Sequence, residues 1–190
     1  MADGADYGWP EDIGPILLSE AQIQQRVAEL GAQISRDYAG KDLMLVGVLK
    51  GVVFFLADLL RAISTPLTLD FLAISRYGAS QQTQGVVRLT KDLNQPLEGW
   101  HVLFVEDIID TGLTTHYIAR SLRLRRPASL QVCVLLNRAR RRLIDVELAY
   151  VGFDIPDAYV VGYGLDYQER YRNLPYLATF EPNRAGNRVA

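Results

Sequence analysis

Short apolar runs alternate with amphipathic segments along most of this chain, and that alternation limits its fold more than any other feature. The runs are rich in branched residues and too short for core helices, so they predict strands buried on both faces. These strands are expected at residues 43–49, 67–74, 102–105 and 130–136. Strands that alternate with helices are typical of βαβ units. We therefore expect an α/β fold, with an open, mainly parallel central sheet flanked by helices on both faces and ligands bound beyond the carboxyl ends of the strands.

The first helix carries the clearest local signal. Ser19 and Gln22 form a capping-box pattern, in which the serine oxygen accepts an amide proton and Gln22 reaches back. Apolar residues then recur at helical spacing from Ile23 to Ile34, and Gly40 is expected to close the segment. Further helices are predicted at residues 52–63 and 113–125, and short late strands at 149–153 and 159–161.

Residues 76–85, RYGASQQTQG, are polar and contain glycine, which predicts a mobile loop whose returning strand occupies residues 86–90. The 190 residues contain no repeat, linker or low-complexity segment, so we expect a single domain over residues 1–190. Residues 1–16 are expected to form an N-terminal arm and residues 182–190 a flexible tail.

Charge and composition exclude several classes of protein. With 20 Lys and Arg against 22 Asp and Glu, the net charge is −2, so no global positive field would draw the chain to nucleic acid or an anionic membrane. Cys133 is the single cysteine, which excludes an intramolecular disulfide and any multi-cysteine metal cluster. The first 14 residues are acidic without an apolar signal region, and no apolar run reaches the roughly 18 residues of a membrane helix. We expect a cytoplasmic protein with no nucleic-acid or membrane partner.

The densest group of polar residues lies between the strand at 102–105 and the helix at 113–125. Its members are Glu106, Asp107, Asp110, Thr111, Gly112 and Thr114. Backbone amides and the helix dipole at such a junction favour a phosphate, while paired carboxylates suit ribose hydroxyls or a hard cation. The alternative is an ordinary polar turn that caps a helix. The patterns GxxxxGKS/T and GxGxxG do not occur, so the fingerprints of nucleoside-triphosphate and dinucleotide sites are missing.

Residues 105–114, VEDIIDTGLT, resemble the phosphoribosyl-pyrophosphate signature of the type I phosphoribosyltransferases, in the form of the hypoxanthine-guanine branch. Other segments agree with that family in order and spacing: VLKG at 48–51, RYG at 76–78, VGFDIPDAYVVGYGLDY at 151–167 and ERYRNLPY at 169–176. The resemblance runs from about residue 17 to residue 176. It implies the family's fold, with a small hood from the chain termini, and a role in purine salvage.

The implied reaction moves a 5-phosphoribosyl group from phosphoribosyl pyrophosphate to N9 of a 6-oxopurine. Hypoxanthine and guanine are the implied bases, and the products are IMP or GMP and pyrophosphate. Breaking the anomeric C–O bond builds positive charge on the ribose and negative charge on the leaving pyrophosphate, so catalysis is expected to depend mostly on positioning and electrostatics. Mg2+ is the implied cofactor.

The resemblance implies roles for single residues at the pyrophosphate end of this substrate. Lys50 and Gly51 match the pyrophosphate loop, in which the peptide between Leu49 and Lys50 is usually cis. Arg172 matches a pyrophosphate contact, where a planar guanidinium can bind two oxygens at once.

Four carboxylates match acidic residues of the family. Glu106 and Asp107 match the pair that binds the ribose hydroxyls directly or through Mg2+, and Asp166 matches the ligand of a second Mg2+. Asp110 matches the catalytic residue near purine N7. It would act there either as a general base or as a hydrogen-bond acceptor that orients the purine, and the sequence leaves both roles open.

The remaining implied contacts surround the 5-phosphate and the purine. Thr111, Gly112, Leu113 and Thr114 match the loop that cradles the phosphate, and Ile109 lies in the same substrate-binding signature. At the purine end, Tyr159 matches the aromatic residue that stacks on the base. Val160 matches the residue whose backbone carbonyl accepts a hydrogen bond from the exocyclic or N1 position of the purine.

Two positions depart from the family pattern. Arg138 occupies the place of the lysine that usually meets purine O6, and arginine is planar and longer, so the order of preference among hypoxanthine, guanine and xanthine stays open. In the mobile loop, Tyr77 is kept but Arg76 replaces the usual serine. The added positive charge is expected to reach pyrophosphate when the loop closes.

Two other functions compete with this one. A nucleotide-sensing regulatory protein of the same fold would keep the phosphoribosyl site and bind RNA through a basic face. We expect the arginines at 140–142 to form a solvated basic turn instead, because no aromatic residues are interleaved with them. A metal-dependent phosphotransfer or ligand-binding domain would use the acidic strand end alone and would leave Lys50, Tyr159 and Arg172 without a role. The family resemblance implies a homodimer or homotetramer.

Overall fold

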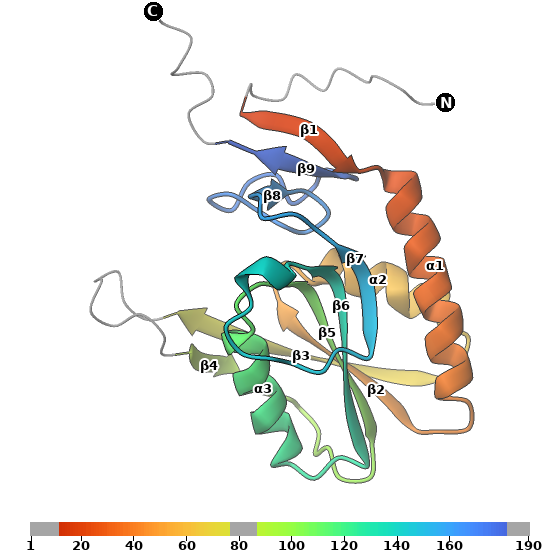
Figure 1. Ribbon diagram of the computed structural model, residues 1–190. Helices are drawn as coiled ribbons and strands as arrows, with labels where there is room; N and C mark the ends of the chain where they lie inside the picture. Colours follow the sequence, from red (N-terminus) through yellow and green to blue (C-terminus); the bar gives the residue numbers. More distant parts are fainter. Residues whose placement is uncertain (1–11, 77–86, 182–190) are drawn as a thin grey trace, which may run out of the picture.

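The computed structural model describes residues 12–76 and 87–181 of the chain. Its central sheet has the strand order β4-β3-β2-β5-β6-β7. The bounds are β2 (Leu43–Leu49), β3 (Leu67–Arg76), β4 (Val87–Lys91), β5 (His101–Ile109), β6 (Ser129–Asn137) and β7 (Tyr150–Asp154). All neighbours are parallel except β3 and β4 (Figure 1). The mainly parallel sheet expected from the apolar runs is therefore confirmed.

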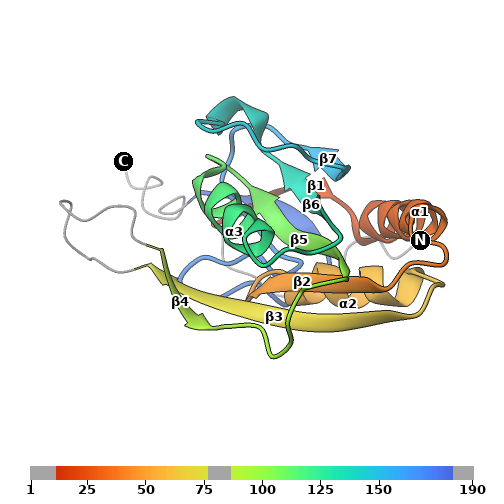
Figure 2. The ribbon, with the colours of Figure 1, turned by 90° about the horizontal axis from the view of Figure 1, so that it is seen from below.

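Helices cover both faces of this sheet. The helices α1 (Glu20–Asp37) and α2 (Val53–Ala62) pack in one apolar cluster, and α3 (Leu113–Arg123) packs in another (Figure 2). Side chains of β2 alternate between the two clusters: Leu45 faces α1 and α2, while Val46 faces the side of α3. Because both faces are covered, the strand is apolar at every position, which is why its sequence reads as a continuous run. None of the helices in the described segments has the length and apolar character needed to cross a bilayer.

Helix α1 begins as its sequence predicts. The Gln22 amide donates to Ser19 Oγ at 3.3 Å, and the Ser19 amide donates to Gln22 Oε1 at 2.8 Å, which completes the capping box. Gly40 takes the expected left-handed conformation, two residues beyond the C-cap Tyr38. The helix ends at Asp37, and Gly40, with φ +71°, lies in the turn beyond it.

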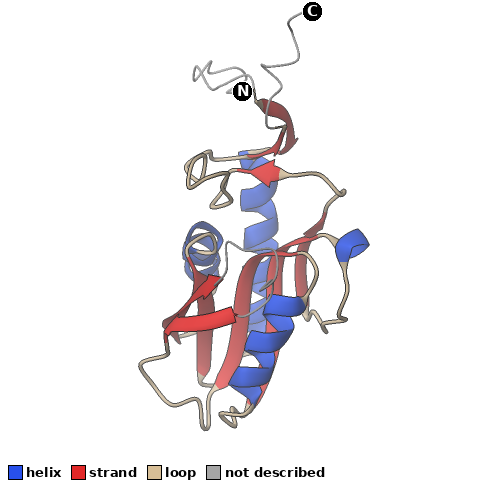
Figure 3. Ribbon diagram, turned by 90° about the vertical axis from the view of Figure 1, so that its left-hand side faces the viewer, coloured by secondary structure: helices blue, strands red, loops and turns tan. Residues whose placement is uncertain are grey.

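A second, smaller sheet lies above the carboxyl ends of the large one. It has the order β1-β9-β8, with β1 (Ile13–Leu18), β8 (Val160–Val161) and β9 (Leu177–Phe180) all antiparallel (Figures 1 and 3). The hood from the chain termini is therefore confirmed. Strand β1 begins inside the segment expected as an N-terminal arm, whereas residues 1–11 and the expected tail at 182–190 lie outside the described residues.

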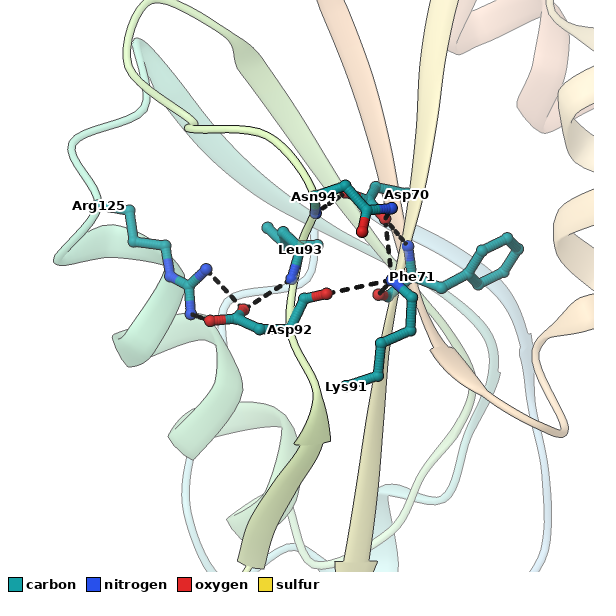
Figure 4. Close-up of polar contacts among 7 residues, drawn as sticks. All are labelled: Asp70, Phe71, Lys91, Asp92, Leu93, Asn94 and Arg125. Carbon is teal, nitrogen blue, oxygen red and sulfur yellow. Dashed lines mark hydrogen bonds and ion pairs between the residues drawn. The ribbon is translucent and has the colours of Figure 1, made fainter.

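A polar cluster fastens the connection between β4 and β5 to strand β3 (Figure 4). The buried carboxylate of Asp70 accepts from the Asn94 amide at 2.6 Å and from Lys91 Nζ at 3.2 Å. Lys91 also donates to the Phe71 carbonyl at 2.6 Å. Strand β4, at Val87–Lys91, lies one residue beyond the returning strand expected at residues 86–90. The loop between β3 and β4, residues 77–86, lies outside the described residues.

Candidate active site

A cavity of about 410 Å³ opens at the carboxyl ends of the parallel strands. Its other side is formed by residues in and around β8, from Tyr159 to Asp166. The strand ends are the edge of the sheet at which the sequence predicted a ligand. Twelve of the predicted site residues line the cavity: Lys50, Gly51, Glu106, Asp107, Asp110, Thr111, Gly112, Thr114, Arg138, Tyr159, Val160 and Asp166. Segments far apart in the chain therefore meet at one site.

Other predicted residues lie outside the cavity wall. Ile109 is buried in the core, and Leu113 is half exposed at the start of α3. Arg172 lies behind Asp166, with its guanidinium 2.7 Å from Asp166 Oδ1. Arg76 ends β3, and Tyr77 lies outside the described residues.

Leu49, named above in the pyrophosphate loop, also lines the cavity. Several residues of the wall were not predicted from the sequence: Val48, Ile74, Ile108, Thr115 and Leu165. Most of them are apolar residues at strand ends, and the sequence does not distinguish an apolar residue that faces the cavity from one that faces the core. Thr115 lies one residue beyond the predicted phosphate-binding residues, so a search over one full helical turn would have included it.

At one end of the cavity, the peptide between Leu49 and Lys50 is cis, as the family resemblance implies. Lys50 Nζ lies 3.2 Å from Glu169 Oε2, and Arg172 Nη2 lies 3.2 Å from the same oxygen. Hydrogen bonds from Lys50 and from Arg172 hold the pKa of Glu169 below its ordinary value. The other terminal nitrogen of Arg172 donates to the Gly164 carbonyl at 2.7 Å. The two groups predicted to bind pyrophosphate are thus joined by one carboxylate.

Gly51 has to be a glycine because the chain is crowded there. A Cβ at this position would collide with Asp107 Oδ2, and a Cβ at Gly164 would collide with the Gly51 carbonyl. The backbone that follows the cis peptide is therefore packed directly against the acidic end of β5 and the segment after β8.

The three carboxylates expected as metal ligands, Glu106, Asp107 and Asp166, all line the cavity. Burial raises the pKa of Asp107 to about 6, and nearby Asp166 adds to the rise, whereas the Ile108 amide and Arg172 oppose it. Within residues 12–76 and 87–181, no three His, Cys, Asp or Glu side chains gather closely enough to hold a metal on their own. Mg2+ is commonly bound by one or two carboxylates together with water and substrate phosphates, so this oxygen-only donor set fits that ion.

Residues 110–114 lead from the end of β5 into the first turn of α3. We call this segment the phosphate loop, because residues 111–114 are the ones predicted to bind a phosphate. Gly112 is the N-cap of α3 and has φ +82°, a left-handed conformation that favours glycine. A side chain at this position would also collide with the Ile144 carbonyl. The first-turn amides of a helix lack partners within the helix, which makes this end suitable for an anion. Among them, the Leu113 amide donates to Thr111 Oγ1 at 3.4 Å.

Asp110 and Arg138 meet beside the phosphate loop. Arg138 is 6% exposed, and it donates to the Ala158 carbonyl at 2.6 Å and to Asp110 Oδ2 at 3.5 Å. Among the described side chains, Asp110 Oδ1 and Arg138 Nε are buried without a hydrogen-bond partner. Asp110 and Arg138 both line the cavity, so a carboxylate acceptor and a guanidinium donor lie next to each other in its wall.

The expected solvated turn at residues 140–142 is only partly correct. A short 3₁₀ helix, η1 (Ala139–Arg141), carries the exposed Arg140, and Arg141 pairs with Asp157 while remaining half exposed. The prediction is wrong for Arg142, which is partly buried and donates to the Asp110 carbonyl at 3.1 Å. The fold turns its side chain inward toward β5.

Tyr159 forms an exposed wall of the cavity. Its side chain is 49% exposed, its hydroxyl donates to the Asp166 carbonyl at 2.9 Å, and its ring meets Tyr167 edge to face. Partial burial, reinforced by Asp166 and Tyr167, raises its pKa. Val160 is buried at the start of β8, where it pairs with Thr179. The ring is fixed from one side and free to contact a ligand on the other.

Comparison with known proteins gives consistent matches along the chain. A family model of the phosphoribosyl transferase domain matches residues 16–168. Hypoxanthine-guanine phosphoribosyltransferases of Mycobacterium bovis and Mycobacterium tuberculosis are each 51% identical over 180 residues, which cover 92% of this chain and 89% of the relative. The crystal structure of a hypoxanthine phosphoribosyltransferase from Staphylococcus aureus aligns with a TM-score of 0.86 at 46% identity, and it covers 90% of this chain and 94% of that one.

Proposed function

The chain belongs to the phosphoribosyltransferase family, in its hypoxanthine-guanine branch, and we propose that it moves a 5-phosphoribosyl group from phosphoribosyl pyrophosphate to N9 of a 6-oxopurine. The observation that carries this assignment is the contact between Asp110 and Arg138, which line the cavity together. One is an acceptor and the other a donor. A 6-oxopurine presents the opposite pair along one edge, with N7–H as donor and O6 as acceptor.

In this reaction the bond between ribose C1 and the pyrophosphate oxygen breaks, and a bond from C1 to purine N9 forms. The electron pair of the broken bond leaves with pyrophosphate, and the purine loses one proton. The chain's contribution is to hold both substrates in line and to stabilise the charges that develop. The phosphate loop would bind the 5-phosphate through its amides, with Thr111 and Thr114 adding hydroxyl donors.

At the purine end, Asp110 accepts the N7 proton or orients N7–H, and Arg138 donates to O6. Tyr159 stacks on the base, and the Val160 carbonyl accepts from its opposite edge. Arg138 is already held by the Ala158 carbonyl, so its orientation is set before the purine arrives. A site built in this way disfavours adenine, because its 6-amino group is a donor and would face the donors of the Arg138 guanidinium.

At the pyrophosphate end, Lys50 and Arg172 neutralise the leaving group. Glu106 and Asp107 would hold the ribose hydroxyls or Mg2+, and Asp166 would hold a second Mg2+. When bound, Mg2+ would supply positive charge to the departing pyrophosphate oxygens. Arg76 and Tyr77 remain predicted contributors from the loop that follows β3.

The setting that fits this activity is the cytoplasm, where both substrates are made and used. A homodimer or homotetramer is the proposed assembly. Phosphoribosyl pyrophosphate and 6-oxopurine bases are the proposed partners, and neither nucleic acid nor a membrane is required by the reaction.

The test is nucleotide formation from phosphoribosyl pyrophosphate, with hypoxanthine, guanine, xanthine, adenine and uracil offered separately, with and without Mg2+. The proposal requires Mg2+-dependent turnover that is confined to 6-oxopurines, and their order would reveal the effect of Arg138. Tight IMP binding with no turnover of any base would favour a nucleotide sensor of the same fold. Retention of the chain on RNA at moderate salt would add to the case for that sensor.

A further inference from the structure

Residues 142–144 run along the back of the phosphate loop and bond to two of its carbonyl groups. Arg142 Nε donates to the Asp110 carbonyl at 3.1 Å. The amides of Leu143 and Ile144 both donate to the Thr111 carbonyl, at 2.9 and 3.1 Å. Three donors from one segment therefore fix two consecutive peptide groups of the loop.

The direction of these carbonyls determines the direction of the amides that follow them. A trans peptide is planar, and its N–H points away from its C=O. The peptides after Asp110 and Thr111 are both trans, because the cis bond of the described chain is the one before Lys50. With the two carbonyls turned toward residues 142–144, the amides of Thr111 and Gly112 point the opposite way, toward the cavity. Neither amide has a hydrogen-bond partner in the described parts of the chain.

Gly112 supports the same arrangement independently. Its missing side chain leaves room for the Ile144 carbonyl and for Cδ of Arg142, which would lie 3.0 Å from a Cβ at this position. The loop and residues 142–144 are thus in direct contact at Gly112, the N-cap of α3.

We propose that Arg142 is a positioning residue for the 5-phosphate: its side chain holds the Asp110 carbonyl so that the Thr111 amide faces the substrate. The Gly112 amide beside it is oriented by the backbone amides of Leu143 and Ile144. This inference rests on the proposed function, since it needs a phosphate-bearing substrate in the cavity. Arg142 acts through the Asp110 carbonyl, on the far side of the loop from the cavity, and it does not line the cavity itself.

The role requires an arginine. While Nε donates to the Asp110 carbonyl, Nη2 donates to Asn137 Oδ1, and Asn137 in turn donates to Asp154 Oδ1 at 2.7 Å. A guanidinium can make both bonds because its donors lie in a rigid, planar fork. Lysine would keep the charge but place a single ammonium group where two separate acceptors need donors.

The experiment compares the dissociation constants of IMP and inosine, which differ by the 5-phosphate, for the full-length protein and for Arg142→Met. We expect the preference for IMP over inosine to fall roughly tenfold in the variant, the effect of losing about one hydrogen bond in a charged site. Inosine binding should be unchanged. Arg142→Lys should give a smaller loss in the same direction, and it provides a second test if Arg142→Met folds poorly.

Arg140→Met is the matched control, because it removes the same charge two residues away from an exposed side chain. It should leave the preference for IMP unchanged. An equal loss of IMP and inosine binding in Arg142→Met would show a general structural role and overturn the proposal, as would an unchanged ratio. Failure of the wild-type protein to bind IMP would instead count against the proposed function, so the two failures are distinguishable.

Discussion

The guanidinium of Arg138 spans the purine end of the site, with one terminal nitrogen 3.5 Å from Asp110 Oδ2 and the other donating to the Ala158 carbonyl at 2.6 Å. The carboxylate proposed to meet the purine proton is therefore joined to the group proposed to meet O6. A lysine at this position has one ammonium group and cannot keep both bonds in the same geometry.

Arg138→Lys should therefore lower kcat/KM for hypoxanthine roughly tenfold, because one of these oriented hydrogen bonds is lost. The KM for phosphoribosyl pyrophosphate should be nearly unchanged, since the substitution is at the purine end. Steady-state kinetics with each substrate varied in turn would check this. A raised KM for phosphoribosyl pyrophosphate with hypoxanthine kinetics unaltered would show that Arg138 has been assigned to the wrong end of the cavity.

Gly112→Ala should weaken both the fold and phosphate binding. Alanine would be strained in the left-handed conformation of this position, and its Cβ would collide with the Ile144 carbonyl. We therefore expect a loss of about 1–3 kcal/mol of stability and a raised KM for phosphoribosyl pyrophosphate. Gly40→Ala is the control, because Gly40 also has positive φ but has open space around it. That variant should lose some thermal stability without a change in KM. If Gly112→Ala and wild type had equal KM values for phosphoribosyl pyrophosphate, the phosphate loop would not be part of the substrate site.

Asp70 makes stability depend on pH. Burial alone would raise its pKa, but hydrogen bonds from the Asn94 and Phe71 amides and from Lys91 outweigh burial and hold the pKa below the ordinary value of 3.8. A carboxyl whose pKa is lowered on folding contributes stability above its unfolded pKa, and that contribution is lost as the pH falls through the folded pKa.

Asp70→Asn should thus destabilise the protein at pH 7 by about 1–3 kcal/mol, with a penalty that shrinks below about pH 4. Urea unfolding of variant and wild type across this range would measure it. Asp92→Asn is the comparison, since Asp92 pairs with Arg125 at a more exposed place and should lose less. If the loss of stability in Asp70→Asn stayed constant with pH, the Asp70 carboxylate would not be the source of this pH dependence.

Local patterns predicted the fold well where the deciding interactions are close in the sequence. The Ser19–Gln22 capping box and the apolar runs of the parallel strands depend on neighbours a few residues away or on burial from both faces. Strands β1 and β9 are different, because Ile13 pairs with Phe180 from the other end of the chain. No short window of sequence contains such a pairing, and only the family resemblance implied a hood.

The site shows the same division. The acidic strand end and Gly112 were predictable because strand, turn and helix follow one another directly. Arg142 was not, since three consecutive arginines look alike in the sequence. The fold alone determines that Arg140 faces solvent while Arg142 faces the Asp110 carbonyl.

The most direct test of the central claim is the rate of IMP formation from hypoxanthine and phosphoribosyl pyrophosphate with Mg2+, measured for wild type and for Asp110→Asn. The exposed Asp145→Asn serves as the control, and calorimetry gives the affinity for phosphoribosyl pyrophosphate. We expect an active wild type, a loss of turnover on the order of 10²-fold or more in Asp110→Asn, and nearly unchanged phosphoribosyl pyrophosphate binding. Turnover of Asp110→Asn close to that of wild type would contradict this expectation.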